Sequence, residues 1–190
     1  MLSGTADAQS REEALVAAAR EGDVHSFEQL VLIHQERAFN IACRLLGQRE
    51  DAEDATQEAF VRAYRGLAKF TGQARFGTWF TRILINVCRT YRGRRQRCTT
   101  AVDPEIPEIR DEAPGPAEAA VQAQVQKAVR EALAELPLKY REVLTLFELE
   151  GMSYEEIAQV LRRPVGTIRS RLNRARLALR DRLAGRVDLD

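Results

Sequence analysis

The sequence predicts an all-α protein with two small helical domains joined by a flexible acidic linker, the second domain containing a helix-turn-helix. Three observations predict this class. Apolar residues recur at helical spacing along most of the 190 residues, and no segment shows a strand pattern. Prolines and acids gather in one stretch between two helical halves. Positive charge is concentrated toward the end of each half, although the net charge is only +1.

Composition excludes several broad classes of protein. Hydrophobic residues make up 45% of the chain and charged residues 30%, which is an ordinary soluble balance. No apolar run approaches the roughly 20 residues of a membrane span, and the first residues lack the basic-then-apolar order of a secretion signal. Cys43, Cys88 and Cys98 are too few and too scattered for a disulfide framework or a CxxC metal site. We therefore expect a cytoplasmic protein without membrane insertion, in which Cys43 and Cys88 are core thiols.

The domain boundaries follow from the acidic linker. Residues 101–120 hold six acids, four prolines and a glycine against one arginine, a composition that disfavours helix. We predict an N-terminal segment with a short helix at 1–22, a first domain at 23–97, a linker at 98–117 and a second domain at 118–185.

Glycines and caps delimit the helices of the first half. A short alanine-rich helix is predicted from Arg11, and Gly22 can end it in a left-handed conformation. Asp23 can cap a long amphipathic helix that ends at Gly47. A third helix is predicted from about Asp51, with alanines on one face and charged residues elsewhere.

Acids cluster at the start of this third helix, at Glu50, Asp51, Glu53, Asp54 and Glu58. Carboxylates at this density could hold a metal or perform acid-base chemistry. No histidine, hydroxyl nucleophile or glycine-rich phosphate loop accompanies them, and acids in a first helical turn already complement the helix dipole. We therefore predict no catalytic residue, no metal site and no cofactor, and favour a protein-contact surface.

A basic segment follows. Residues 71–97 hold seven arginines and no acid, with a loop at 70–78 followed by a helix over 78–92. Aromatic rings beside a flexible basic loop suit single-stranded nucleic acid, because unstacked bases need π-faces and the backbone needs cations. Core packing is the preferred interpretation for Trp79. For Phe70 and Phe76, core packing and base stacking both stay open.

In the second half, helices are predicted at 117–134 and 138–149, followed by the helix-turn-helix. Ser153 and Glu156 can form a capping box at the start of its first helix. Pro164 ends the preceding pattern and is well accepted in the first turn of a new helix.

The second helix of this motif has two distinct faces. Ile168, Leu172, Ala175 and Leu179 form one apolar stripe. The opposite face carries side chains able to bond base edges in a major groove, namely Arg169, Ser170, Asn173 and Arg174. A solvated amphipathic helix would also have a charged face, but such helices usually mix signs. From Arg162 to Arg182 there are eight arginines and one acid, which favours DNA binding.

Four segments carry a resemblance to a known family. They are DAEDATQEAFVRAYR at 51–65, FGTWFTRILIN at 76–86, LPLKYREVLTLFELEGMSYEEIAQVL at 136–161 and PVGTIRSRLNRAR at 164–176. Together, and in this order, they closely resemble the extracytoplasmic-function (ECF) sigma factors of bacteria. The resemblance covers nearly the whole chain outside the linker and the first dozen residues.

The resemblance implies a two-domain, non-catalytic subunit that binds the clamp and flap of core RNA polymerase and recognises and melts promoters, often in a stress response. It implies clamp binding for Asp54, Gln57, Glu58 and Arg62. It implies contact with the minus-ten element for Phe70, Arg75, Phe76, Arg82, Asn86 and Arg89. It implies contact with the minus-thirty-five element for Arg169, Ser170, Asn173 and Arg174. The linker would thread toward the RNA exit channel, and an anti-sigma factor could restrain the protein, including at the membrane.

One departure and two alternatives accompany this interpretation. Arg162 and Arg163 stand where many relatives have a glycine and an apolar residue in the turn. The first alternative is a stand-alone helix-turn-helix regulator of duplex DNA, which would need no polymerase. The second is a metal-dependent nuclease that uses the acids at 50–58, which the missing partners for those acids disfavour.

Overall fold

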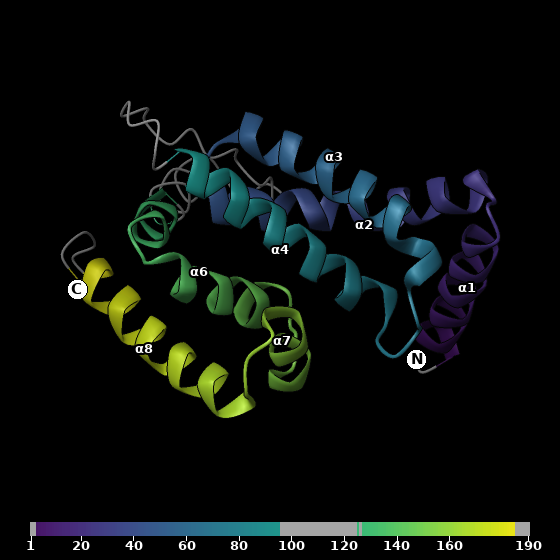
Figure 1. The fold of residues 1–190 in the computed structure, drawn as a ribbon. Helices are drawn as coiled ribbons and strands as arrows, with labels where there is room; N and C mark the ends of the chain where they lie inside the picture. The colour runs from purple at the N-terminus through teal and green to yellow at the C-terminus, as the bar shows by residue number, and fades with distance from the viewer. Residues whose placement is uncertain (1–2, 96–124, 126, 185–190) are drawn as a thin grey trace, which may run out of the picture.

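The computed structural model describes residues 3–95, 125 and 127–184, and within them all regular secondary structure is helical (Figure 1). The elements are α1 (Ser3–Arg20), α2 (Val24–Leu46), α3 (Arg49–Gly66), the 3-10 turn η1 (Leu67–Lys69), α4 (Phe76–Arg95), a helix at 127–134, α6 (Leu138–Leu144), the π-helical η2 (Thr145–Leu149), α7 (Tyr154–Leu161) and α8 (Val165–Leu183). None of these helices is long and apolar enough to cross a membrane. The linker predicted at 98–117 lies outside the described residues.

The first helical group consists of α1 to α4, with α2, α3 and α4 packed together and α1 against the N-terminal half of α2 (Figure 1). Its core contains fully buried residues of α2 and α4 such as Leu30, Leu45 and Leu84. On α3 the buried row is small, at Ala52, Ala55, Ala59 and Ala63. Because these alanines share one helix face, α3 can lie close to its neighbours.

The predicted caps of this group are confirmed. The Asp23 carboxylate accepts a hydrogen bond from the His25 N–H at 3.1 Å, which satisfies a free amide at the start of α2. Gly47 ends α2 at φ 79°, and Gly22 has φ 100°. In contrast, α1 begins well before Arg11, since no proline or glycine follows Gly4 until Gly22.

The second helical group runs from residue 127 to α8 and contains the predicted helix-turn-helix. Ser153 and Glu156 form both halves of a capping box at α7, as predicted. The single helix predicted over 138–149 is instead α6 followed by one π-helical segment. Gly151 ends it at φ 61°. The start of the helix predicted at 117–134 lies outside the described residues.

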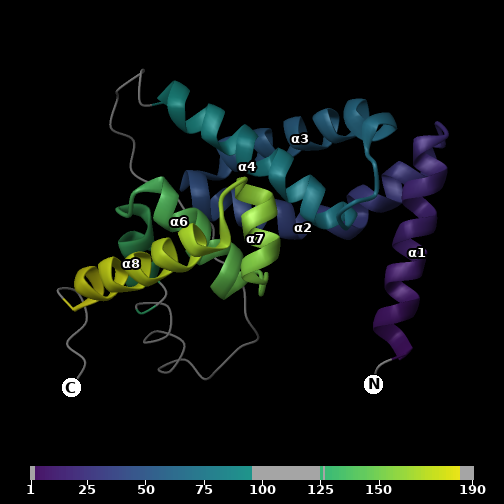
Figure 2. The same cartoon turned by 60° about the horizontal axis from the view of Figure 1, so that its bottom comes forward.

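The two groups are in direct contact, which the sequence did not predict. Helix α7 lies against α4, and α6 and η2 lie against α2 (Figures 1 and 2). The Arg141 guanidinium is buried at this junction, with 1% of the residue exposed. It donates to the carbonyl oxygens of Leu45 at 2.8 Å and Leu136 at 3.1 Å, and also to that of Ala134. A cation therefore satisfies carbonyls near the ends of α2 and of the helix at 127–134, where the helix dipoles are negative.

Candidate nucleic-acid interface

The outer face of α3 carries the predicted polymerase contacts. Asp54, Gln57 and Arg62 are exposed and Glu58 is half-buried, all outside the buried alanine row. Arg62 donates to the Glu58 carboxylate in an i,i+4 pair. The pKa of Tyr91 on α4 is raised, mainly by burial. The negative charge of the Glu58 carboxylate, to which the Tyr91 hydroxyl is hydrogen-bonded, is the second cause.

An apolar residue on this face was missed by the sequence analysis. Val61 has 48% of its surface exposed, one position before Arg62. A large aliphatic side chain at this exposure has no core role, so the face combines charge with an apolar contact point. The sequence feature that could have identified Val61 is its position outside the alanine row of α3.

The predicted aromatic platform is buried. Phe70 has 6% of its surface exposed and Phe76 4%. Their ring centroids lie 4.9 Å and 5.7 Å from that of Trp79, respectively. Of the two open interpretations, core packing is the one that the structure shows for Phe70 and Phe76, and neither ring offers a free stacking face. They instead fix the loop against the start of α4.

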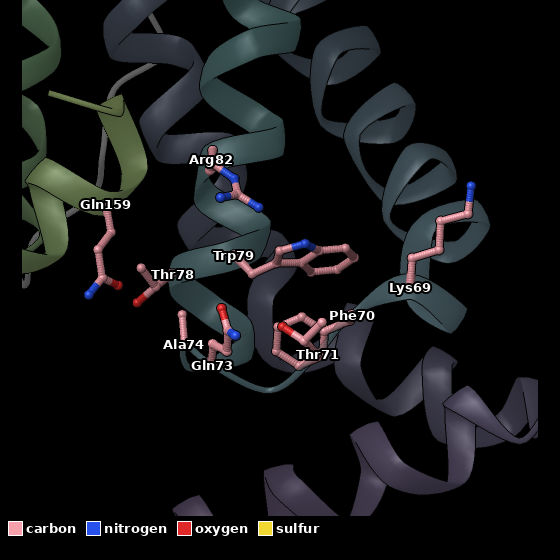
Figure 3. Close-up of a pocket in the computed structure, with 9 residues that line it drawn as sticks. All are labelled: Lys69, Phe70, Thr71, Gln73, Ala74, Thr78, Trp79, Arg82 and Gln159. Carbon is pink, nitrogen blue, oxygen red and sulfur yellow. The ribbon is translucent and has the colours of Figure 1, made fainter.

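Polar residues of α4 form a stripe beside this loop, defined by Thr78, Arg82, Asn86 and Arg89. Their spacing of four, four and three residues places them on one helix face. The first two line a pocket of about 530 Å³, together with Lys69, Phe70 and Trp79 (Figure 3). The predicted residue Arg75 is exposed just before α4.

Gln159 from α7 also lines this pocket, beside Thr78 (Figure 3). The sequence analysis missed this residue. No local pattern could have found it, because it reaches the pocket only through the packing of the two helical groups.

Arg89 at the far end of the stripe is already engaged. Its Nε and Nη2 donate to the two Glu142 carboxylate oxygens at 2.7 Å and 2.9 Å, and its Nη1 donates to Asn86 Oδ1 at 3.3 Å. The hydrogen bonds to Glu142 raise the pKa of Arg89. Glu142 lies on α6 in the second helical group, and its side chain is only 3% exposed. The sequence analysis assigned it no role.

The predicted base-reading face of α8 is open. Ile168, Leu172 and Ala175 are buried beneath it. Arg169, Ser170, Asn173 and Arg174 are all exposed. The Arg169 guanidinium lies 5.4 Å from the centroid of the Tyr154 ring, a cation–π contact that positions it.

Two chain segments match family models: residues 30–98 match Sigma-70 region 2, and residues 126–179 match Sigma-70, region 4. The chain is 38% identical over 180 residues to the RNA polymerase sigma-H factor of Pseudomonas aeruginosa, with 90% of this chain and 93% of the relative covered. This chain is an ECF RNA polymerase sigma factor. It is 34% identical over 184 residues to the ECF RNA polymerase sigma-E factor of Haemophilus influenzae, with 92% and 96% covered.

Solved structures of similar fold agree with this assignment. CnrH in complex with the cytosolic domain of CnrY has a TM-score of 0.67 and 29% identity, with 93% of this chain and 99% of that chain covered. RpoE of Bartonella quintana in complex with the anti-sigma factor NepR has a TM-score of 0.67 at 24% identity, a likeness of fold.

The family settles the main predictions. This sigma factor is a non-enzymatic polymerase subunit that initiates transcription, so the nuclease alternative was wrong. The all-α class with a helix-turn-helix is confirmed. Matches to both region 2 and region 4 also set aside a stand-alone duplex regulator. Below, region 2 means the first helical group and region 4 the second.

Proposed function

We propose that this sigma factor works through three surfaces, each assigned to one partner. The outer face of α3 binds the polymerase clamp, the stripe on α4 with its pocket engages the minus-ten element, and the exposed face of α8 reads the minus-thirty-five element. The observation that carries the proposal is that one chain holds two separate polar surfaces of different chemistry, the stripe with its pocket on α4 and the exposed face of α8.

The minus-ten assignment rests on the stripe and the pocket. Arg82 and Asn86 can bond a phosphate and a base edge, while the pocket beside Trp79 has room for an extruded base. Unlike an open stacking platform, this arrangement offers polar partners around one concavity. It suits a strand whose base has already left the duplex. Arg75, exposed next to the loop, adds a phosphate contact.

The minus-thirty-five assignment rests on α8. Arg174 can bond a guanine and Asn173 an adenine in a bidentate manner. Ser170 donates to the Thr167 carbonyl at 3.0 Å and is exposed, so its hydroxyl oxygen can still accept a hydrogen bond. The neighbouring arginines supply phosphate contacts that hold the register.

The clamp assignment rests on charge and exposure. Asp54 and Gln57 point away from the core of region 2, so they can meet a partner without disturbing the fold. We propose core polymerase, through its clamp and flap, as the main partner and promoter DNA, double- and single-stranded, as the second.

We further propose a cytoplasmic protein restrained by an anti-sigma factor, which could itself be held at the membrane. The support is by similarity: CnrH and the Bartonella RpoE were each solved with a partner, in the second case an anti-sigma factor.

Run-off transcription from randomised promoters with purified core polymerase tests the proposal. We expect transcripts that share two upstream sequence elements and that require both proteins. Sequence-specific binding by the free chain at nanomolar level, with no need for polymerase, would argue against the proposed dependence of the two DNA surfaces on the clamp contact.

A further inference from the structure

The residue before α4 cannot cap this helix. The backbone N–H of Trp79 donates to the Arg75 carbonyl oxygen at 3.1 Å, which makes Arg75 the N-cap residue. An arginine side chain carries only donors, so it cannot accept from the free N–H groups of the first turn. Residues 71–97 contain no acid. A carboxylate for this helix end must therefore come from another part of the chain.

Glu12 of α1 supplies that carboxylate. Its Oε1 lies 3.3 Å from Nε2 of His34 on α2. It also accepts a hydrogen bond from the backbone N–H of Gly77, the second residue of α4. The pKa of Glu12 is lowered, first by the hydrogen bond with His34 and further by the charge of Arg75 and the Gly77 amide. Glu12 thus does what an N-cap side chain at Arg75 would do, and its negative charge suits a helix N-terminus.

His34 joins this carboxylate to the packing of α4. Its side chain is only 10% exposed, and its ring centroid lies 5.2 Å from that of Phe76. A Cβ at Gly77 would lie 3.3 Å from Cε1 of His34, so the absence of a side chain at Gly77 leaves room for the ring. Helices α1 and α2 and the first turn of α4 therefore meet around His34.

The same turn of α4 supports the pocket proposed for the extruded base. The Phe76 ring centroid lies 5.7 Å from that of Trp79 and 6.3 Å from that of Phe70, and both of these residues line the pocket (Figure 3). On the other side of the loop, a hollow of about 460 Å³ separates it from α1. The loop is thus not fully packed against α1, so a fixed contact at its end matters for its position.

We propose that Glu12 is a positioning residue of the minus-ten site. Through the Gly77 amide and His34 it fixes the first turn of α4, and with it the wall of the pocket at Trp79. Glu12 does not line that pocket, so it acts through α4 and not on DNA. Without it the turn frays, and only the fraction of chains with an ordered turn is competent to bind. This inference rests on the proposed role of the α4 stripe and its pocket.

The test compares three full-length variants of α1. Glu12→Ala removes the acceptor, whereas Glu12→Gln keeps an acceptor oxygen of nearly the same shape and loses only the charge. Glu13→Ala is the matched control, because Glu13 is the neighbouring acid, is exposed and accepts a hydrogen bond from Gln9 of the same helix at 3.0 Å. Circular dichroism checks that each variant folds. Glu12→Asp, which withdraws the carboxylate by one methylene, replaces Glu12→Ala if that chain does not fold.

The first readout is the fluorescence of Trp79 in the free chain. Trp79 is the only tryptophan of the protein, so its emission reports the pocket wall alone. We expect Glu12→Ala to shift the emission to longer wavelength and to increase quenching by acrylamide. Glu12→Gln and Glu13→Ala should match the wild type.

A local cap should rescue this signal. Arg75→Ser places a hydroxyl acceptor at the N-cap position itself. In the Glu12→Ala background it should restore the wild-type emission of Trp79. Only fluorescence is measured on this double variant, because Arg75 belongs to the proposed minus-ten contacts. Failure of the rescue would overturn the capping role of Glu12.

The second readout is promoter opening with core polymerase, on a duplex promoter recovered by the run-off selection. Permanganate reactivity of thymines should fall about fivefold for Glu12→Ala, the size expected for one lost N-cap. Glu12→Gln and Glu13→Ala should open the promoter normally. Binding to core polymerase and base preference at the minus-thirty-five element should be unchanged in all three. A merely destabilised chain would instead lose all of these activities together.

The decisive negative result is a folded Glu12→Ala chain, or Glu12→Asp chain in its place, with wild-type Trp79 emission and wild-type opening. Altered emission without a loss of opening would also overturn the inference, since Glu12 would then position a turn that the minus-ten element does not need. A wild-type chain that opens no promoter with core polymerase would refute the proposed function instead, so the two failures are distinguishable.

Discussion

The two proposed DNA-reading surfaces of this sigma factor differ in how their helices are packed. Helix α8 is held by a single stripe with Ile168, Leu172 and Ala175 buried, and the other face is left to solvent. Helix α4 lies between neighbours and buries Leu84, Ile85, Val87 and Cys88 within five consecutive positions. Only a narrow stripe of it can reach a ligand, and an adjacent helix can cover that stripe. A peripheral helix therefore leaves a whole face open to a ligand, whereas a central helix leaves only a stripe.

The largest expected effect comes from disrupting the proposed contact with core polymerase, on which both DNA surfaces depend. Asp54→Arg should weaken binding to core polymerase by more than about a hundredfold, roughly 3 kcal/mol. The substitution replaces an acid of the proposed interface by a base, which repels the positively charged polymerase groups that the acid would attract. Pull-down and titration against core enzyme measure it. Glu13→Arg, the same reversal at an exposed acid on α1, is the control and should bind normally. The contrary result is an Asp54→Arg chain that is destabilised but whose folded fraction still binds polymerase normally. Asp54 would then face the core of region 2 and not the polymerase.

The next effect isolates the α8 surface. Arg174→Ala should cost about 1–3 kcal/mol at one upstream base position and relax the preference there, as for other bidentate base contacts. Run-off transcription on single-base promoter variants measures it. Arg180→Ala removes the same charge from an exposed arginine of α8 that pairs with Asp181. That control should weaken binding evenly across sequences, and equal base preferences in the two variants would argue against a reading role for Arg174.

A smaller effect isolates the α4 surface. Asn86→Ala should reduce transcription from duplex promoters about tenfold, since one lost polar contact to an extruded base is worth about 1–2 kcal/mol. A template already unpaired at the minus-ten element should recover much of this loss, because unstacking no longer opposes binding. Permanganate reactivity of thymines near the start site reports the opening directly. Rescue of Arg174→Ala by the unpaired template, without rescue of Asn86→Ala, would exchange the roles of the two surfaces.

Local chemistry made much of this fold predictable. The capping box at Ser153, the Asp23 cap and the left-handed Gly47 depend on neighbours within a few positions, and all three are present in the structure. The exposure of Asn173 and Arg174 followed from the apolar stripe opposite them. These features hold whatever the rest of the chain does, so the helical periodicity was sufficient to find them.

Contacts between distant segments could not be predicted in this way. Glu142 and Arg89 are 53 positions apart, on either side of the linker, and nothing in either local pattern points to the other. The same holds for Arg141. Its local sequence is that of an ordinary surface arginine on a short helix, and only the contact with the Leu45 carbonyl in the folded chain shows otherwise. Phe70 and Phe76 show the intermediate case: an aromatic residue beside a loop is compatible with a core or a ligand, and only packing decides.

The smallest expected effect concerns the turn of the helix-turn-helix. Arg162 caps α7 at φ 50°, the one non-glycine residue with positive φ in the described chain, where the sequence already departed from the family. A Cβ in this region costs roughly 1–2 kcal/mol, and the greater freedom of glycine in the unfolded chain offsets part of the gain. Arg162→Gly should therefore raise the free energy of unfolding by about 0.5–1 kcal/mol and the Tm by about 1–3 °C.

Thermal unfolding of Arg162→Gly beside Arg162→Ala checks this assignment. The alanine variant keeps the Cβ and loses the rest of the Arg162 side chain, so it should show no gain in Tm. Equal melting temperatures for the two variants would mean that the backbone at this turn stores no strain. The same pair sharpens the contrast between the two surfaces. If Arg162 also contacts a phosphate, both variants should weaken binding to the minus-thirty-five element equally, because both lack the guanidinium, whereas their response to a pre-opened minus-ten template should not change.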